Sequence, residues 1–283
     1  MSAWDAWIGR EERRDDRIDP GHVARWCATL DRQTPADGTV AQGFHWCLGL
    51  PDAQSAMLGP DGHPRRDDSP DSFLPPVPLP RRMWASSKVE FLQPLHVNEA
   101  VLRTSRVAAI TVKHGGSGEL VFVDVAHETM GEHGLAVREM QTVVYREAAA
   151  PGTPPGPPPL GTDRFDPAGW TRHRALEPCE AVLFRYSALT FNSHRIHYDL
   201  PYAMREENYR GLVVHGPLTA SLLLDLARRE LGDNALKTFA FRGMSPAICG
   251  EMLHLVLRSN AAAIELGAYA GDGRQVMNAS AGV

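Results

Sequence analysis

Cysteine is scarce in this chain of 283 residues, which contains only four, and no two of them form a C-x-x-C pair. Their wide spacing suggests neither a zinc knuckle nor a disulfide framework. The sequence also lacks any apolar run of about 18 residues, the length that spans a bilayer. Its N-terminal stretch has no apolar core of a signal peptide. We therefore expect a protein of the reducing cytoplasm, neither secreted nor embedded in a membrane.

Clusters of positive charge are missing as well. The chain has 29 Lys and Arg against 34 Asp and Glu, a formal net charge of -5, and the basic residues are scattered. Nucleic acids and anionic membranes are recognised by clustered positive charge, so we expect neither as a partner. Apolar residues are plentiful at 43%, enough for the core of one large domain or of two ordinary ones.

Proline and glycine divide the chain into two halves. Residues 151–159 read P-G-T-P-P-G-P-P-P. Proline lacks an amide donor and has a fixed φ, which excludes both helix and central strand from this stretch. We predict an N-terminal domain over residues 1–147, a proline-rich linker over 148–162 and a C-terminal domain over 163–283.

In the first half, Asp19 and Pro20 form an N-cap and N1 pair for a helix that ends near Leu30. A tract rich in proline and glycine follows at 59–80 and predicts a long loop. Beyond it, runs rich in Val, Thr, Ile and Phe predict an antiparallel meander. Its four strands are expected at 88–91, 101–112, 120–129 and 136–145.

The second half has one strong helical pattern, from Pro217 to Leu231. Leu218, Leu222 and Leu226 recur at a spacing of four and make an apolar stripe. One short strand is predicted before this helix, at 182–187, and four after it, at 236–242, 250–258, 262–270 and 275–280. A long helix followed by antiparallel strands indicates an α+β fold in which a sheet wraps a central helix. The meander common to both halves suggests a duplicated pair.

Polar side chains gather in residues 191–199, which read F-N-S-H-R-I-H-Y-D. Loops at the ends of elements often display catalytic groups, and histidine moves protons near neutral pH. Further on, Gly216 stands directly before Pro217 at the predicted helix start. An amide at the positive end of a helix can bind a carbonyl oxygen as it becomes an enolate. The two stretches together predict a catalytic centre with an oxyanion site.

These stretches resemble the MaoC-like, or hydratase-2, branch of the hot-dog superfamily, where a D-x-N-P-x-H motif precedes an H-G pair at the start of the central helix. His197 falls on the motif histidine, and Asn192 stands at the position of the aspartate. His194 takes the place of the motif asparagine and Arg195 that of the proline. Asparagine is no carboxylate base, so a simple Asp–His pair cannot be carried over whole.

Longer strings at 185–203 and 209–217, with 74–85 and 89–95 in the first half, are similar to the HTD2-type and mesaconyl-C4-CoA (itaconyl-CoA) hydratase subgroup. This resemblance covers nearly the whole chain. It implies a double hot-dog fold, with antiparallel sheets that each wrap a central helix. The N-terminal domain is then a degenerate hot-dog and the C-terminal domain carries the catalytic site.

The resemblance implies a hydro-lyase that adds water reversibly across the C2=C3 bond of an enoyl-CoA, with mesaconyl-C4-CoA or itaconyl-CoA giving citramalyl-CoA. The Gly216 amide then binds the thioester carbonyl while His197 takes a proton from water. Asn192 orients that water, and Asp199 or His194 holds the imidazole. We expect no cofactor, and no metal either, because neither H-E-x-x-H nor a cysteine partner accompanies the two histidines.

Substrate binding has further candidates. A dicarboxylic acyl chain needs a fixed cation, and arginine offers a bidentate fork for a carboxylate. Exposed charge and contact with CoA phosphates are equal alternatives for these arginines. The candidates are Arg185, Arg195 and Arg242, together with His215, which otherwise caps or packs.

Three other functions remain open. One is dehydration of linear 3-hydroxyacyl thioesters, which a long apolar tunnel would favour over a short pocket closed by arginine. Another is a non-catalytic acyl-CoA-binding module. A regulatory role for such a module is disfavoured, because no DNA-binding segment is appended. The third is a thioesterase, which would need a carboxylate nucleophile that the motif lacks. Because hot-dog domains usually pair, two of them can pair within one chain, and a homodimer of such chains is a further expectation.

Overall fold

The computed structural model describes residues 3–115, 118–259 and 263–283. The strands of its first half are β1 (Glu11–Arg17), β2 (Arg81–Phe91), β3 (Ala100–Gly115), β4 (Gly118–Gly131) and β5 (Gly134–Arg146). Those of its second half are β6 (Arg172–Leu176), β7 (Thr238–Gly243), β8 (Leu253–Ser259), β9 (Ile264–Ala270) and β10 (Gln275–Gly282). All four strands of the first predicted meander are confirmed, and so are the four predicted after the long helix, except that residue 262 lies outside the described residues.

The two halves repeat one strand order. The sheet runs β1-β3-β4-β5-β2-β7-β10-β9-β8-β6, so each half places its first strand at the outside and its second strand at the inside. The inner strands β2 and β7 pair antiparallel, from Ser86 opposite Arg242 to Glu90 opposite Thr238. The expected two sheets are therefore joined into one, with the topology that a duplicated pair predicts.

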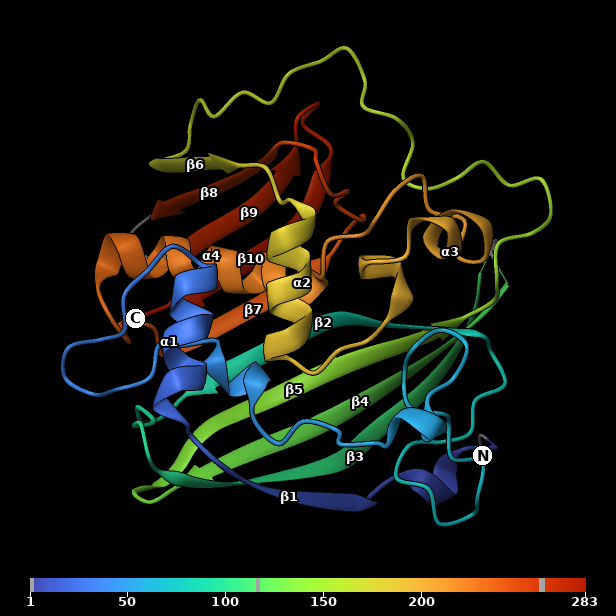
Figure 1. Ribbon diagram of the computed structural model, residues 1–283, viewed down its shortest axis with the longest axis horizontal. Coiled ribbons are helices and arrows are strands. Elements are labelled where there is room, and N and C mark those ends of the chain that lie inside the picture. Colours follow the sequence, from blue (N-terminus) through green and yellow to red (C-terminus); the bar gives the residue numbers. More distant parts are fainter. Residues whose placement is uncertain (1–2, 116–117, 260–262) are drawn as a thin grey trace.

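Helices occupy one side of this sheet, which curves around α1 (Pro20–Thr29), α2 (Glu180–Leu189) and α4 (Gly216–Leu231) (Figure 1). The predicted cap of α1 is confirmed, because Asp19 accepts a hydrogen bond from the amide of His22 at 2.7 Å. Helix α4 buries Leu218, Leu222 and Leu226 and contacts β8, β9 and β10. Each such leucine contributes about 1.5–3 kcal/mol on burial. The fold is the expected α+β hot-dog, centred on α4.

The first half has no helix as long as α4 among its described residues. Between α1 and β2 the chain forms two short 3-10 turns, η2 (Phe44–Cys47) and η3 (Ser55–Met57), in addition to η1 (Asp5–Trp7) near the N-terminus. The tract at 59–80 is the predicted long loop and contains neither helix nor strand. The helix of the first half is the shorter α1.

The strand predicted at 182–187 is wrong, because these residues belong to helix α2. Val182, Leu183 and Phe184 read as a short apolar run. The buried positions of the helix are Leu183, Tyr186 and Leu189, three residues apart, which is a helical spacing. Strand β1 was not predicted, because its sequence E-E-R-R-D-D-R has no apolar alternation.

The proline-rich segment lies against the second half. The amide of Gly156 donates to the carbonyl of Asn208 at 2.9 Å, and the amide of Arg210 donates to the carbonyl of Gly156 at 3.0 Å. These bonds hold the segment beside α3 (Leu200–Arg205), a short helix that follows the polar stretch.

Within the described residues, no helix is both long enough and apolar enough to cross a membrane.

Candidate active site

The polar stretch 191–199 connects α2 to α3 and contains the 3-10 turn η4 (Arg195–His197). The chain turns tightly at the start of this stretch, where Phe191 has a φ of +46°. Asn192 then folds the chain back on itself, since its Oδ1 accepts a hydrogen bond from the amide of His194 at 3.0 Å. The side-chain oxygen of Asn192 thus stabilises the loop.

His197 is buried, and its ring is held by one hydrogen bond. Its Nδ1 lies 2.7 Å from the carbonyl oxygen of Val213. Because a carbonyl can only accept, Nδ1 carries the hydrogen and Nε2 keeps a lone pair. Burial, with His215 as the next cause, holds the pKa of His197 well below its ordinary value. The ring is therefore a neutral base whose accepting nitrogen has no partner in the part of the chain that the structure describes.

His215 stacks directly on this ring, with centroids 3.5 Å apart and planes at 18°. Its Nε2 lies 2.8 Å from the hydroxyl of Ser187, which joins α2 to the start of α4. Burial lowers the pKa of His215 to about 3. Two neutral imidazoles thus stand at the N-terminus of the central helix.

Gly216 is the first residue of α4, and His215 is its N-cap. First-turn amides have no acceptor within their own helix. A Cβ atom added at Gly216 would meet no atom within 4 Å among the described residues, so the space beside this amide is open. The glycine does not have a positive φ, and its backbone turn does not require it. The arrangement suits an oxyanion that approaches the helix start closely.

The buried imidazole pair predicts a pH dependence of stability. In the unfolded chain His215 titrates near 6.5, whereas in the folded protein its pKa is about 3. The unfolded state then binds more protons between these values, so the free energy of unfolding should fall as pH falls from about 6.5 towards 3. Urea unfolding at a series of pH values measures this slope. His215→Gln should give a shallower slope, and an identical slope would contradict the prediction.

Asp199 and Arg195 interact with each other. Oδ2 of Asp199 accepts from Nε and Nη2 of Arg195 at 3.0 and 2.7 Å, and its Oδ1 accepts from the amide of Tyr202 at the start of α3. The Arg195 guanidinium also lies 4.1 Å above the ring of Tyr202. The imidazole of His197 is instead held by the Val213 carbonyl. Asp199 thus caps α3 and orients an arginine.

The other two candidate arginines lie elsewhere. Arg185 is exposed on α2, and Arg242 is exposed on β7 opposite Ser86. Within the described ranges neither forms an ion pair. The structure therefore brings together His194, His197, His215 and Gly216, but not these two arginines.

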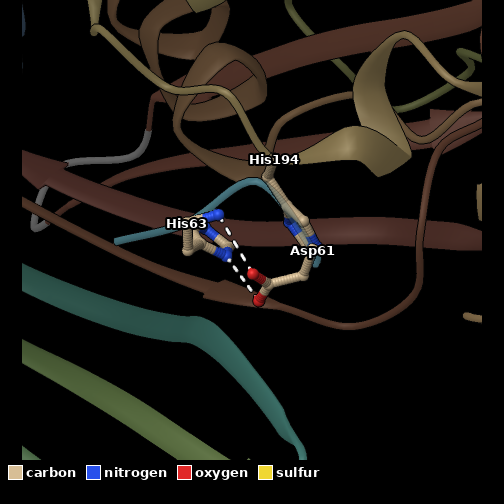
Figure 2. A group of neighbouring side chains, drawn as sticks. All are labelled: Asp61, His63 and His194. Atoms are coloured by element: carbon tan, nitrogen blue, oxygen red, sulfur yellow. Dashed lines mark hydrogen bonds and ion pairs between the residues drawn. The ribbon is translucent and has the colours of Figure 1, made fainter. Parts of the chain in front are cut away.

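Two residues that the sequence analysis did not predict lie beside the polar stretch. The loop at 59–80 places Asp61 and His63 beside His194 (Figure 2). The ring of His63 lies 4.1 Å from that of His194, which in turn lies 5.6 Å from that of His197. Four imidazoles thus form a row from the first half to the start of α4.

Asp61, His63 and His194 also have the chemistry of a metal site. One ligand atom of each lies within 4.8 Å of the others, and two imidazoles with one carboxylate suit a divalent transition metal. In this structure the Asp61 carboxylate instead accepts a hydrogen bond from Nδ1 of His63 at 3.1 Å. Asp61 and His63 are thus hydrogen-bonded, and the ring of His194 packs on that of His63.

A single antiparallel sheet that wraps a central helix, with a histidine pair at the start of that helix, is typical of the hydratases and dehydratases of the MaoC-like hot-dog class, which are hydro-lyases. The chain belongs to the family "hydroxyacyl-thioester dehydratase type 2", whose sequence model matches residues 43–249. This match includes the loop with Asp61 and His63, the polar stretch and the start of α4. The family predicted from the motifs is confirmed.

Known proteins agree with this assignment. The chain is 40% identical over 280 residues to the mesaconyl-C(4)-CoA hydratase of Chloroflexus aurantiacus, covering 98% of this chain and 96% of that protein. It is 25% identical over 268 residues to the mitochondrial hydroxyacyl-thioester dehydratase type 2 of Schizosaccharomyces pombe, covering 84% and 83%. The crystal structure of a MaoC-like dehydratase from Phytophthora capsici shares the fold, with a TM-score of 0.72, 13% identity and coverage of 99% and 98%.

Proposed function

We propose that this chain adds water reversibly across the C2=C3 bond of an enoyl-CoA thioester. One observation carries the proposal: the buried ring of His197 has one nitrogen fixed by the Val213 carbonyl and the other without a partner among the described residues, beside the open N-terminus of α4. A fixed neutral imidazole next to unpaired helix amides is the pair of groups that hydration needs. The base activates water, and the amides stabilise the enolate.

The reaction then uses these groups in a defined order. The thioester oxygen accepts from the Gly216 amide, which draws electrons towards the carbonyl and makes C3 electrophilic. A water oxygen bonds to C3 while Nε2 of His197 takes one of its protons. The enolate electrons form a C2–H bond with the proton that returns from Nε2 of His197, so the imidazole is neutral again. The product is the 3-hydroxyacyl thioester, and dehydration is the same path reversed.

The substrate we propose is a thioester of a C5 dicarboxylic acid, mesaconyl-C4-CoA or itaconyl-CoA, with citramalyl-CoA as product. Its support is the 40% identity, over nearly the full length of both chains, to a mesaconyl-C(4)-CoA hydratase. The second candidate is dehydration of linear 3-hydroxyacyl thioesters. It is favoured by the family description and by the relative from Schizosaccharomyces pombe.

A panel of thioesters separates these candidates. The protein is mixed with mesaconyl-C4-CoA, itaconyl-CoA and crotonyl-CoA, and the loss of enoyl-thioester absorbance is followed. We expect the two C5 substrates to give kcat/KM at least about tenfold above crotonyl-CoA, because about 1.4 kcal/mol, the worth of one hydrogen bond to a charged group, corresponds to a tenfold ratio. Preference for crotonyl-CoA would support the linear substrate instead. Release of free CoA would indicate a thioesterase, and no reaction with any member would refute hydration.

A further inference from the structure

The loop that contains Asp61 is fixed on the polar stretch by backbone contacts. The carbonyl of Asp61 accepts from the amide of Arg195 at 2.9 Å, and the carbonyl of Gly62 accepts from the hydroxyl of Ser193 at 2.5 Å. Gly62 has a φ of +87°, and an added Cβ would lie 2.0 Å from the Ser193 carbonyl oxygen. A third contact comes from Arg195, whose Nη1 donates to the carbonyl of Pro60 at 2.8 Å. The position of the loop relative to His194 is thereby set at the level of the main chain.

Asp61 and His63 form a pair at the tip of this loop. Oδ1 of Asp61 accepts from the amide of His63 at 3.0 Å, and Oδ2 accepts from Nδ1 of the same residue at 3.1 Å. A carboxylate bonded to one ring nitrogen fixes the tautomer and the plane of an imidazole.

The ring that Asp61 fixes packs on His194. The two rings lie 4.1 Å apart at 38°, and Figure 2 shows all three side chains grouped together. The His194 side chain is only 12% exposed, and its Nε2 lies 3.9 Å from Glu207 on its other side. Its ring is edge-on to that of His197, at 87°. His194 thus contacts His63 of the first half and lies close to the imidazole that takes the proton.

The polar stretch itself supplies no free ionised group to support His197. Asn192 occupies the position of the motif carboxylate, and its oxygen is already bonded to the amide of His194. No ionised group of the stretch 191–199 lies free beside His197, since Asp199 is bonded to Arg195. Two carboxylates lie near His194: Glu207, which is paired with Arg81, and Asp61, which is bonded to His63, the ring that packs on His194.

We propose that Asp61 and His63 are positioning residues of the hydration site, which the first half of the chain supplies to the second. Asp61 fixes His63, and His63 fixes His194, so that His194 and His197 together orient the water that attacks C3. Asp61, His63 and His194 together take over the role of the motif aspartate, whose position is occupied by Asn192 in this chain. This inference rests on the proposed hydration activity.

Asp61→Asn tests the carboxylate with little disturbance, because asparagine keeps the oxygen that accepts from the His63 amide. We expect kcat for the best thioester to fall about 100-fold, the cost of misplacing a reacting group by about 1 Å, with KM changed less than about twofold. Asp61→Glu should recover part of the loss. The matched control is Asp67→Asn in the same loop, because Asp67 accepts from the amide of Ser69 at 2.9 Å in the same way and is exposed. It should keep wild-type kcat.

His63→Phe is the second variant, since it keeps a ring against His194 but removes the nitrogen bonded to Asp61. It should lower kcat as Asp61→Asn does, while thermal unfolding of both variants stays within a few degrees of wild type. Wild-type kcat in Asp61→Asn would overturn the inference. So would loss of wild-type activity in EDTA with recovery on adding zinc, because the cluster would then be a metal site. If the wild type hydrates no thioester, the proposed function fails first, whatever the variants show.

Discussion

His197→Asn should lower kcat for hydration about 1,000-fold, within the range that one positioned acid–base group contributes. Asparagine can still donate to the Val213 carbonyl from a position close to Nδ1, so the fold of the site should persist. What is lost is Nε2, the only atom of the ring that can take the proton from water. Steady-state kinetics on the preferred thioester, with circular dichroism to confirm folding, measures the effect.

The control for this variant is His22→Asn. His22 also has a ring nitrogen bonded to a backbone carbonyl, that of Leu189 at 2.9 Å, but it lies outside the row of imidazoles. It should retain wild-type kcat. Equal losses in the two variants would show that the effect comes from packing, and an unchanged kcat in His197→Asn would remove His197 from the mechanism.

Gly62→Ala should have the second large effect, on stability and activity together. An alanine at positive φ costs about 1–2 kcal/mol. The added methyl group also meets the Ser193 carbonyl, which belongs to the main chain and cannot rotate away. We expect a total loss of about 2–5 kcal/mol in the free energy of unfolding, since overpacking adds about 1–3 kcal/mol. Because the loop must then shift, kcat should fall about 100-fold.

Gly38→Ala separates the two causes. Gly38 has a φ of +78°, but an added Cβ there would meet no described atom within 4 Å. It should therefore lose only the cost of the backbone conformation and keep its kcat. Urea unfolding and kinetics on both variants give the comparison. Similar losses of stability in the two would mean that the loop is not fixed on the polar stretch.

Sequence periodicity predicted the parts of the fold whose burial is regular. Leu218, Leu222 and Leu226 identified α4, and the Val- and Thr-rich runs identified the strands of both meanders. It failed at β1, because a strand made of charged residues has no apolar period. It also failed at α2, where a helix so short contains an apolar run that reads as a strand. In both cases the tertiary neighbours, β3 for β1 and α1 for α2, select the structure.

The motif located half of the site. His197 and Gly216 could be found because the spacing of their residues along one segment resembles a known pattern. Asp61 and His63 could not, since the hydrogen bond between Ser193 and Gly62 spans 131 positions of sequence. The one local signal was the string Asp61-Gly62-His63, a polar pair around a glycine within a tract interpreted only as a loop. A contact between distant segments leaves no period in a single sequence.

The order of the sheet determines which strands lie at its edges. Pairing of β2 with β7 leaves β1 and β6 as the outermost of its described strands. Outer strands present unpaired backbone groups, and charged side chains there discourage other chains from adding to the sheet. β1 reads E-E-R-R-D-D-R, and β6 begins R-H-R. The charged residues of β1 are the reason that apolar alternation did not predict this strand. The same charges discourage other chains from pairing with the edge of the sheet.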